Sequence, residues 1–199
     1  MKERSILTHI VAVGLMAALV FVSSLISIPV PSVIGISRIH LGNIFCLLAG
    51  FLLGGLRGGL AAGFGSAIYD MTNPAYIAEA PITFINKFLL AFVCGLVYAK
   101  LRGEEDDEKS PVFSRAWLST VVAAICGSLT YVILYLGKAM INDLLFLRTE
   151  WETAMIDVGT RAVTSLVNAL IAVVVSVPLF RALVPALRRA HLGKFLQVK

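Results

Sequence analysis

Long uninterrupted runs of apolar residues alternate along the chain with short polar segments. Four of these runs reach the roughly 20 residues that a helix needs to cross a bilayer. They predict membrane-spanning helices at about 6–28, 80–100, 116–142 and 157–180. The prolines of the segment SIPVPS, which cannot continue a helix, end the first of them.

A further apolar stretch, residues 39–71, is too long for one span and short for two. Its middle reads GGLRGG (residues 54–59), and glycine pairs around an arginine favour a tight turn. We therefore expect two short helices, at about 41–54 and 58–71. The chain is predicted to be an all-α membrane protein with six transmembrane helices, of which helices 2 and 3 are short.

Composition agrees with a membrane protein. Of the 199 residues, 58% are hydrophobic and 15% are charged, whereas a soluble domain is about 25% charged. Six spans with short connections use nearly the whole chain. We therefore expect a single membrane domain, residues 1–199, that ends in a cytoplasmic tail at 181–199.

The basic residues predict the orientation of the spans. With the N- and C-termini both cytoplasmic, 12 of the 17 Lys and Arg residues lie in cytoplasmic segments, in agreement with the positive-inside rule. The other five are Arg38, Lys87, Lys138, Arg148 and Arg161. A five-span alternative places the basic 100–115 loop outside, against that rule. The acidic run 104–108 has little weight in orientation, and we interpret it as a solvated loop.

The net charge of +5 is explained by this topology, so it does not indicate a nucleic-acid partner. Cys46, Cys94 and Cys126 lie in apolar runs without a CxxC or Cys/His spacing. Such cysteines are typical packing residues, and we predict neither disulfides nor a metal site, and no cofactor.

Polar side chains recur at three- and four-residue spacing on the last three predicted spans, which places each set on one face of its helix. The sets are Glu79, Thr83, Asn86 and Lys87 on the fourth span, Tyr131, Tyr135, Lys138 and Asn142 on the fifth, and Asp157, Arg161, Thr164, Ser165 and Asn168 on the sixth. All three sets lie in the outer half of the bilayer, and the inner halves are nearly without polar residues. The same outer compartment is bordered by Arg38, His40, Asn43, Asp70 and Trp151.

Polar groups inside a span are costly, so three stripes at one depth predict a binding pocket that opens outward and is closed inward. For a single residue a purely structural interpretation stays open. Asp157 can neutralise Arg161 one turn away. Lys87 and Lys138 can extend to the outer headgroups. The tyrosines and Trp151 suit a flat or ring-bearing ligand, and the deeper basic side chains favour an acidic or carbonyl-rich one.

Small residues form a second pattern. Glycines recur at every fourth position between residues 50 and 63, and Gly14, Ala17 and Ala18 give the first span a small-residue face. Such faces let helices approach closely. Internal packing and docking of a partner membrane protein both remain open for them.

Catalytic motifs are missing from the sequence. The Gly-Lys pairs at 137–138 and 193–194 lack the other residues of a phosphate-binding loop, and there is no HExxH or GxSxG motif. We expect the chain not to be an enzyme, and in particular to have no ATPase site of its own.

The segment that begins RIHLGN at Arg38 and continues through LLAGFLLGGLRGGLAAGFGSAIYD to Asp70 resembles the second helix and glycine-rich hairpin of a known family. These are the S components, the substrate-specific subunits of energy-coupling factor (ECF) transporters. Residues 80–100 resemble the fourth helix of the family. With the topology, the resemblance covers nearly the whole chain.

The resemblance implies a subunit of a bacterial or archaeal plasma membrane that binds a water-soluble vitamin or related micronutrient from outside. It also implies association with a transmembrane coupling protein and two cytosolic ATPase subunits, and reorientation of the whole subunit to release ligand inside. The AxxxA docking motif of the family falls at Gly14 and Ala18, where glycine replaces the first alanine. Ligand contacts are expected from the first outer loop and helices four to six.

The ligand stays open at this point: riboflavin-, pyridoxine- and pyrimidine-like compounds, pantothenate and folate all remain. The alternative function is a stand-alone secondary transporter or channel for a small polar solute. That alternative requires polar residues through the inner leaflet, which the sequence lacks. A third possibility, a small membrane enzyme, has no motif to support it.

Overall fold

The computed structural model of the protein describes residues 2–74, 76–102 and 115–190. Most of this part is helical. The helices are α1 (Lys2–Leu25), α2 (Gly42–Leu53), α3 (Gly55–Met71), α4 (Ala80–Leu101), α5 (Arg115–Ile141) and α6 (Trp151–Arg189). Shorter elements are the strands β1 (Ser27–Pro31) and β2 (Ile36–His40), the 3-10 turn η1 (Ile77–Glu79) and the π-helical turn η2 (Asn142–Phe146). The predicted acidic loop 104–108 and residues 191–199 of the predicted tail lie outside the described residues.

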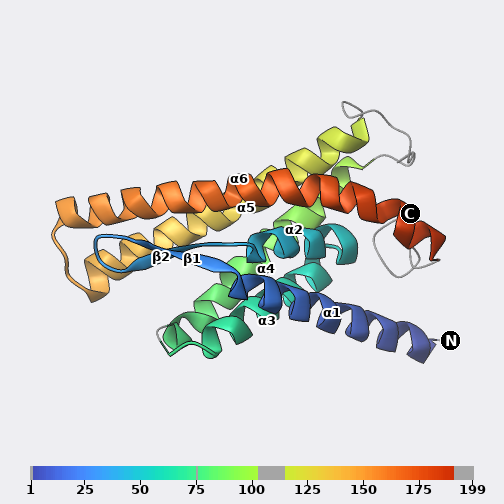
Figure 1. Ribbon diagram of the computed structural model, residues 1–199, viewed down its shortest axis with the longest axis horizontal. Helices are drawn as coiled ribbons and strands as arrows, with labels where there is room; N and C mark the ends of the chain where they lie inside the picture. The colour runs from blue at the N-terminus through green and yellow to red at the C-terminus, as the bar shows by residue number, and fades with distance from the viewer. Residues whose placement is uncertain (1, 75, 103–114, 191–199) are drawn as a thin grey trace.

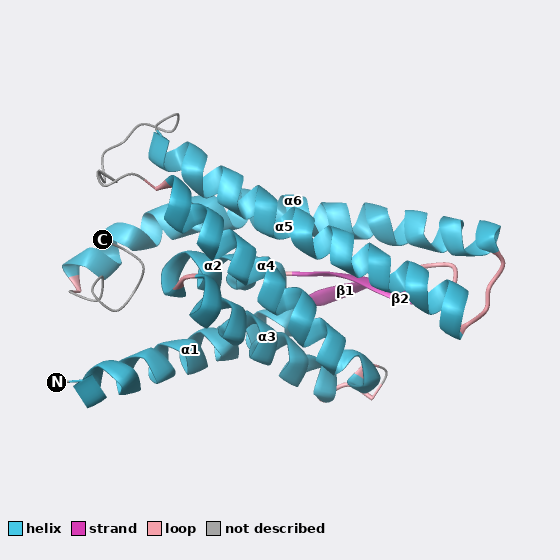
Figure 2. Ribbon diagram, turned by 180° about the vertical axis from the view of Figure 1, so that it is seen from behind, coloured by secondary structure: helices cyan, strands magenta, loops and turns pink. Residues whose placement is uncertain are grey.

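The longest helices set the shape of the molecule. In Figures 1 and 2, α5 and α6 run side by side and extend at one end beyond the other helices, and the β1–β2 hairpin lies along this extension. The first turns of α1 and the last turns of α6 lie at the opposite end (Figure 1). The hairpin end is therefore the one that, in the predicted orientation, faces outward.

Four helical segments of the described residues are long and apolar enough to cross a bilayer. They are Ile6–Leu25, Ile77–Leu101, Ala116–Phe146 and Trp151–Arg189. The helices α2 and α3 have 12 and 17 residues and are shorter than a full span. The short second and third helices are thus present, while the six-span count and the position of the termini stay predictions.

The connection between the first two helices corrects the all-α expectation. Helix α1 ends at Leu25 instead of residue 28, and β1 pairs with β2 in an antiparallel ladder that places Ile28 opposite Ile39. The sequence S-I-P-V-P alternates β-branched residues with prolines. Because a two-stranded sheet has two free edges, prolines can take strand positions whose missing N–H faces away from the partner. The prolines that end the helix therefore do not exclude a strand.

The glycine-rich segment also differs from the tight turn expected between helices at 41–54 and 58–71. The break between α2 and α3 is a single residue, Gly54, with φ 82°, and α3 begins at Gly55. The other glycines serve close packing. A Cβ at Gly58 would lie 2.5 Å from the carbonyl oxygen of Ala49, which real structures do not tolerate. Glycine thus allows α3 to fold back directly against α2.

Helix α6 is longer than expected at both ends, covering 39 residues instead of the predicted 157–180. At 1.5 Å per residue it is about 58 Å long, roughly twice the hydrocarbon thickness of a bilayer. Trp151, expected in an outer loop, is its first residue, and the predicted tail is helical up to Arg189.

An aromatic cluster closes the interior at the end away from the hairpin. The ring of Phe51 stacks on Phe180 at 4.8 Å between centroids, and Tyr98 meets both rings edge-on. Phe51 and Phe180 are fully buried. Packed side chains therefore fill the half of the bundle that the sequence leaves without polar residues.

Candidate functional site

A cavity lies between the β1–β2 hairpin and the outer halves of the helices. The space between its atoms, including the open mouth, is about 790 Å³. Its lining residues are Ser24, Ile36, Ser37, Arg38, His40, Ser66, Tyr69, Asp70, Tyr76, Glu79, Thr83, Asn86, Lys87, Tyr131, Tyr135, Lys138, Arg161, Ser165 and Asn168.

Twelve of the sixteen residues proposed from the sequence as substrate-binding lie on this one cavity. They are Arg38, His40, Glu79, Thr83, Asn86, Lys87, Tyr131, Tyr135, Lys138, Arg161, Ser165 and Asn168. The polar stripes of α4, α5 and α6 thus face a common space instead of separate lipid surfaces. Contact of these residues with a ligand stays a prediction.

Four proposed residues do not line the cavity. Asn43 is buried and accepts a hydrogen bond from Lys87. Asp157 is also buried, and its carboxylate is occupied by Arg161 and the backbone of the hairpin. Asn142 and Trp151 are exposed on the extension of α5 and α6, because η2 and the longer α6 carry them away from the cavity.

Sequence spacing missed most of the lining from α1 and α3. Ser24 closes the end of α1, and Ser66 and Tyr69 come from the second half of α3. Asp70 was expected only to border the compartment. Ser66 and Asp70 are four positions apart on α3 and therefore lie on one face of it. The same helical spacing rule, applied to this glycine-rich helix, would have found them.

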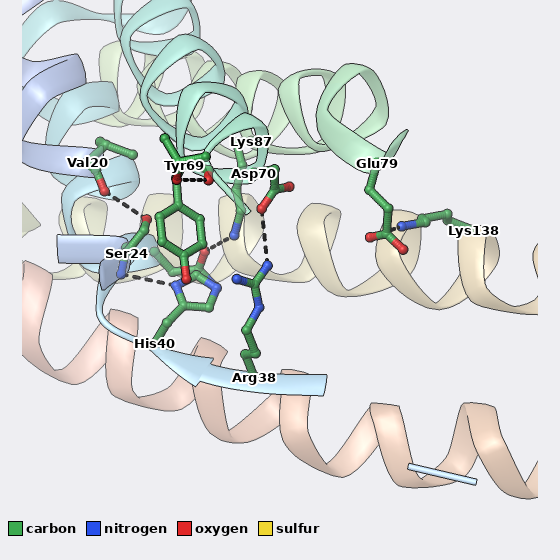
Figure 3. Close-up of polar contacts among 12 residues, drawn as sticks. Val20, Ser24, Arg38, His40, Tyr69, Asp70, Glu79, Lys87 and Lys138 are labelled. Carbon is green, nitrogen blue, oxygen red and sulfur yellow. Dashed lines mark hydrogen bonds and ion pairs between the residues drawn. The ribbon is translucent and has the colours of Figure 1, made fainter. Parts of the chain in front are cut away.

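Arg38 is held in the cavity by an ion pair and by contacts with two aromatic rings. Figure 3 shows it reaching from β2 toward the end of α3, where its Nη2 donates to Asp70 at 3.1 Å. The guanidinium lies 3.8 Å from the ring centroid of Tyr76 and 5.0 Å from that of Tyr69. Burial by itself lowers the pKa of Arg38, but the hydrogen bond to Asp70 and the electrostatic interactions with Tyr69, Asp70 and Tyr76 together outweigh it, so the pKa is raised. The hairpin is thereby fixed across the cavity to α3.

Lys87 is a buried cation without a carboxylate partner among the described residues. Its ammonium group donates to the side-chain oxygen of Asn43 and lies 4.0 Å from the ring centroid of Tyr131. The residue is 5% exposed. An amide oxygen and an aromatic face solvate an ammonium only in part. Lys87 therefore offers a charged donor to a ligand in the cavity.

The other cations of the site are each paired with an acid. Lys138 of α5 bonds Glu79 at 2.6 Å in an exposed ion pair (Figure 3). Arg161 of α6 bonds Asp157 at 2.5 Å. With Arg38 also paired, Lys87 is the cation of the cavity that has no ion pair in the described part of the chain.

Side chains of α5 and α6 hold the hairpin over the cavity. The side-chain oxygen of Asn168 accepts the N–H of His40 at 3.0 Å, and its NH₂ donates to the Arg38 carbonyl at 2.6 Å. The hydroxyl of Tyr135 bonds Ser37 at 3.1 Å. Asp157 accepts the N–H of Ile34 at the hairpin turn at 2.8 Å. These bonds fix the hairpin over the cavity from one end of β2 to the other.

His40 is held as a neutral ring. Its Nδ1 accepts the N–H of Gly42 at 3.1 Å. Burial, followed by the positive charges of Lys87 and Arg38, lowers the pKa of His40 well below its ordinary value. His40 therefore contributes a neutral imidazole to the lining at physiological pH.

The expected docking face of α1 is only partly available. Gly14 and Ala18 are exposed, and a Cβ at Gly14 would meet no atom within 4 Å in the described structure. The backbone of Ala17 instead packs against Gly65 of α3. Gly14 and Ala18 are accessible to a partner, whereas Ala17 belongs to internal packing.

Comparisons with known proteins point to one family. The model of the family described as "ECF-type riboflavin transporter, S component" matches residues 5–185. A search of curated proteins finds no match. A solved structure described as "Structure and mechanism of the S component of a bacterial ECF transporter" is similar with a TM-score of 0.56 and 17% sequence identity. The match covers 90% of this chain and 97% of the other, and at this identity it shows a common fold.

Proposed function

Because the chain belongs to the ECF-type riboflavin transporter S component family, we propose that its outer cavity binds riboflavin or a closely related flavin. Membership makes the chain a substrate-binding membrane subunit of an ECF transporter and not an enzyme. The resemblance noted in the sequence is confirmed at this level. The ligand and the partner subunits are the part proposed here.

The observation that carries the proposal is the unpaired charge of Lys87 beneath a cavity with aromatic walls. A flavin has a flat ring system with an edge of carbonyl oxygens and ring nitrogens that accept hydrogen bonds. The stacked rings of Tyr131 and Tyr135, 5.7 Å apart, suit a flat ligand. Lys87 lies at the face of Tyr131. It is placed to donate to the acceptor edge of such a ring, and a charge-assisted bond in a desolvated site is strong.

The rest of the site suits an uncharged ligand. With Lys87 bonded to the ring edge, the remaining cations Arg38, Lys138 and Arg161 are already paired with acids, so a phosphate group at the other end of the ligand would have to displace one of these carboxylates. We therefore expect riboflavin to bind more tightly than its 5′-phosphate.

The proposal extends to the working assembly. We propose six spans with both termini in the cytoplasm, in the plasma membrane of a bacterium or archaeon, and association with a transmembrane coupling protein and two cytosolic ATPases. The ligand enters from the hairpin end and leaves after reorientation of the whole subunit. The aromatic packing of Phe51, Tyr98 and Phe180 supports a body without its own inner exit.

Quenching of flavin fluorescence by the purified chain tests the ligand. We expect tight binding of riboflavin, and a loss of about 10- to 100-fold in affinity for Lys87→Met, the value of a hydrogen bond to a charged group. Lys100→Met is the matched control, because Lys100 is exposed near the other end of the same helix.

The outcomes separate the alternatives. No binding of riboflavin by a folded wild-type chain would overturn the proposed ligand, and equal affinity of the wild type and Lys87→Met would overturn the assigned role of Lys87. Uptake by the isolated chain in liposomes, driven by an ion gradient without partner subunits, would favour a stand-alone secondary transporter.

A further inference from the structure

The connection between α5 and α6 presents large apolar side chains to its surroundings. Leu145, Phe146, Leu147 and Trp151 are 69%, 78%, 52% and 62% exposed. They lie at the end of the molecule where α5 and α6 extend beyond the other helices (Figure 1). We call residues 145–151 the α5–α6 tip. Exposed apolar side chains that gather in one place mark an interaction surface.

The tip is a turn fixed by backbone hydrogen bonds. The N–H of Leu147 donates to the carbonyl of Asn142 at 3.0 Å and closes the π-helical turn η2. Thr149 donates twice to the carbonyl of Asp143, from its N–H at 3.0 Å and from its hydroxyl at 2.5 Å. Helix α6 then begins at Trp151. The apolar side chains of the tip are therefore held away from the protein by an ordered backbone.

The tip is continuous with the lipid-facing surface of the two helices. Exposed apolar residues recur along each helix at spacings of four, seven and eight, which places each set on one face. They are Ile133, Ile141 and Leu145 on α5 and Ile156, Val163, Leu170 and Val174 on α6. Both helices are apolar enough to cross a bilayer, so these faces contact lipid. Leu145 belongs to the α5 face and to the tip, and the two surfaces are one.

The lengths of the helices determine how far the tip reaches. The apolar segment Ala116–Phe146 has 31 residues and is about 45 Å long at 1.5 Å per residue. The distance along α6 from Trp151 to Arg181, where the basic residues of the inner end begin, is also about 45 Å. The hydrocarbon layer is only about 30 Å thick. Upright helices would therefore hold the tip about 15 Å above that layer, beyond the headgroups and in water.

A tilt of α5 and α6 removes this conflict. At a tilt of about 35–40°, within the range of transmembrane helices, 45 Å of helix covers about 36 Å of membrane depth. The tip then lies in the headgroup layer. In Figures 1 and 2, α1 and α4 run obliquely to α5 and α6, so these helices cannot all stand upright in one membrane.

We propose that the α5–α6 tip inserts into the headgroup layer of the outer leaflet and anchors the outer ends of two tilted helices there. Aromatic side chains such as Trp151 favour this layer. Arg148 is exposed and has no ion pair among the described residues, so it is free to contact lipid phosphates. The exposed Glu150 and Glu152 face the water side of the layer. Because α6 bonds the β1–β2 hairpin, the anchor also holds the cavity mouth at the membrane surface.

Tryptophan fluorescence of the full chain in phosphatidylcholine nanodiscs tests the anchor. The chain has two tryptophans, so Trp117→Phe leaves Trp151 as the reporter. We expect strong quenching of Trp151 by phosphatidylcholine brominated near the glycerol, and weak quenching by lipid brominated near the methyl ends. Aqueous iodide should quench it severalfold less than free tryptophan amide. Phe146→Trp, in a chain with both native tryptophans changed to Phe, should behave in the same way from the end of η2.

Val163→Trp in the same tryptophan-free chain is the control for depth, because Val163 faces lipid about 18 Å along α6 from Trp151. It should be quenched most by bromine near the methyl ends. Iodide quenching of Trp151 equal to that of tryptophan amide, without quenching by lipid, would place the tip in water and overturn the proposal. Protection from iodide and from both brominated lipids would show that protein, such as a second copy, covers the tip, and would overturn it as well. The test needs neither ligand nor partner subunits, so a failure of the riboflavin assignment leaves it intact.

Discussion

The side-chain amide of Asn168 bonds Arg38 through the backbone of β2, with its NH₂ donating to the Arg38 carbonyl at 2.6 Å. Its oxygen accepts the N–H of His40 on the same strand. The side chain of a helix residue thus makes two backbone hydrogen bonds to β2, as a neighbouring strand would. Asn168 lines the cavity, but both of its polar groups are used by the hairpin, so its main role is to position Arg38 and His40.

Asn168→Asp tests this positioning role. A carboxylate cannot donate to the Arg38 carbonyl, and it places a negative charge against that oxygen. We expect riboflavin affinity to fall by about tenfold or more, since 1.4 kcal/mol corresponds to a factor of ten. Thr164→Val is the control one turn away, because Thr164 does not line the cavity and its hydroxyl bonds the carbonyl of Thr160 on its own helix. Unchanged riboflavin affinity of Asn168→Asp contradicts the positioning role of Asn168.

A second prediction concerns the ion pair that joins the hairpin to α3. Arg38→Met leaves Asp70, which is 3% exposed, without its cation. Removal of one member of a buried pair costs about 3–5 kcal/mol, so the unfolding temperature in detergent should fall clearly. Adding Asp70→Asn removes the orphaned charge and should restore most of the stability. A double mutant no more stable than Arg38→Met indicates that the pair is not coupled.

The stripes of α4, α5 and α6 were predictable because helix geometry converts residue spacing into a common face, and distance along the helix into depth. Lys87, Tyr135 and Arg161 therefore appear on one cavity in the sequence and in the structure. The same rule failed at Asn142, where the π-helical turn η2 changes the phase of the helix. Trp151 was expected in an outer loop and not placed by this rule, and it lies off the cavity because α6 begins at this residue.

The β1–β2 hairpin that covers the cavity could not be predicted from the sequence, for a different reason. Bonds from Asn168 and Asp157, more than 100 positions away, hold the hairpin in place over the cavity. Local propensity cannot supply such contacts. The prolines of β1 indicated only where the helix ends.

His40 gives a prediction about pH. Its pKa lies below the ordinary value of 6.5 because of burial and the nearby cations, so the unfolded chain binds the proton more readily. Its contribution to stability is fully present above about pH 6.5 and is lost as the pH falls below that value. We expect the unfolding temperature of the wild type to drop between about pH 7 and about pH 5.5, and His40→Gln to drop less. His9→Gln on α1 is the control. An equal drop in all three proteins contradicts the assignment to His40.

The last prediction concerns the exposed small residues of α1. A leucine at Gly14 meets no atom of the described structure within 4 Å of its Cβ, and Ala18 is exposed on the same face. The folded subunit should therefore tolerate Gly14→Leu with Ala18→Leu and bind ligand with unchanged affinity. A coupling protein packed against this face loses its close approach. We expect uptake by the complete transporter to be abolished.

Gly137→Leu separates docking from a general effect of bulk, because Gly137 of α5 is also exposed and also has free space at its Cβ in the described structure. This variant should retain uptake. Co-purification with the coupling protein gives the second measurement: it should be lost for the α1 double variant and retained for Gly137→Leu. If the double variant retains both uptake and co-purification, the partner binds elsewhere, and the small residues of α1 face lipid alone.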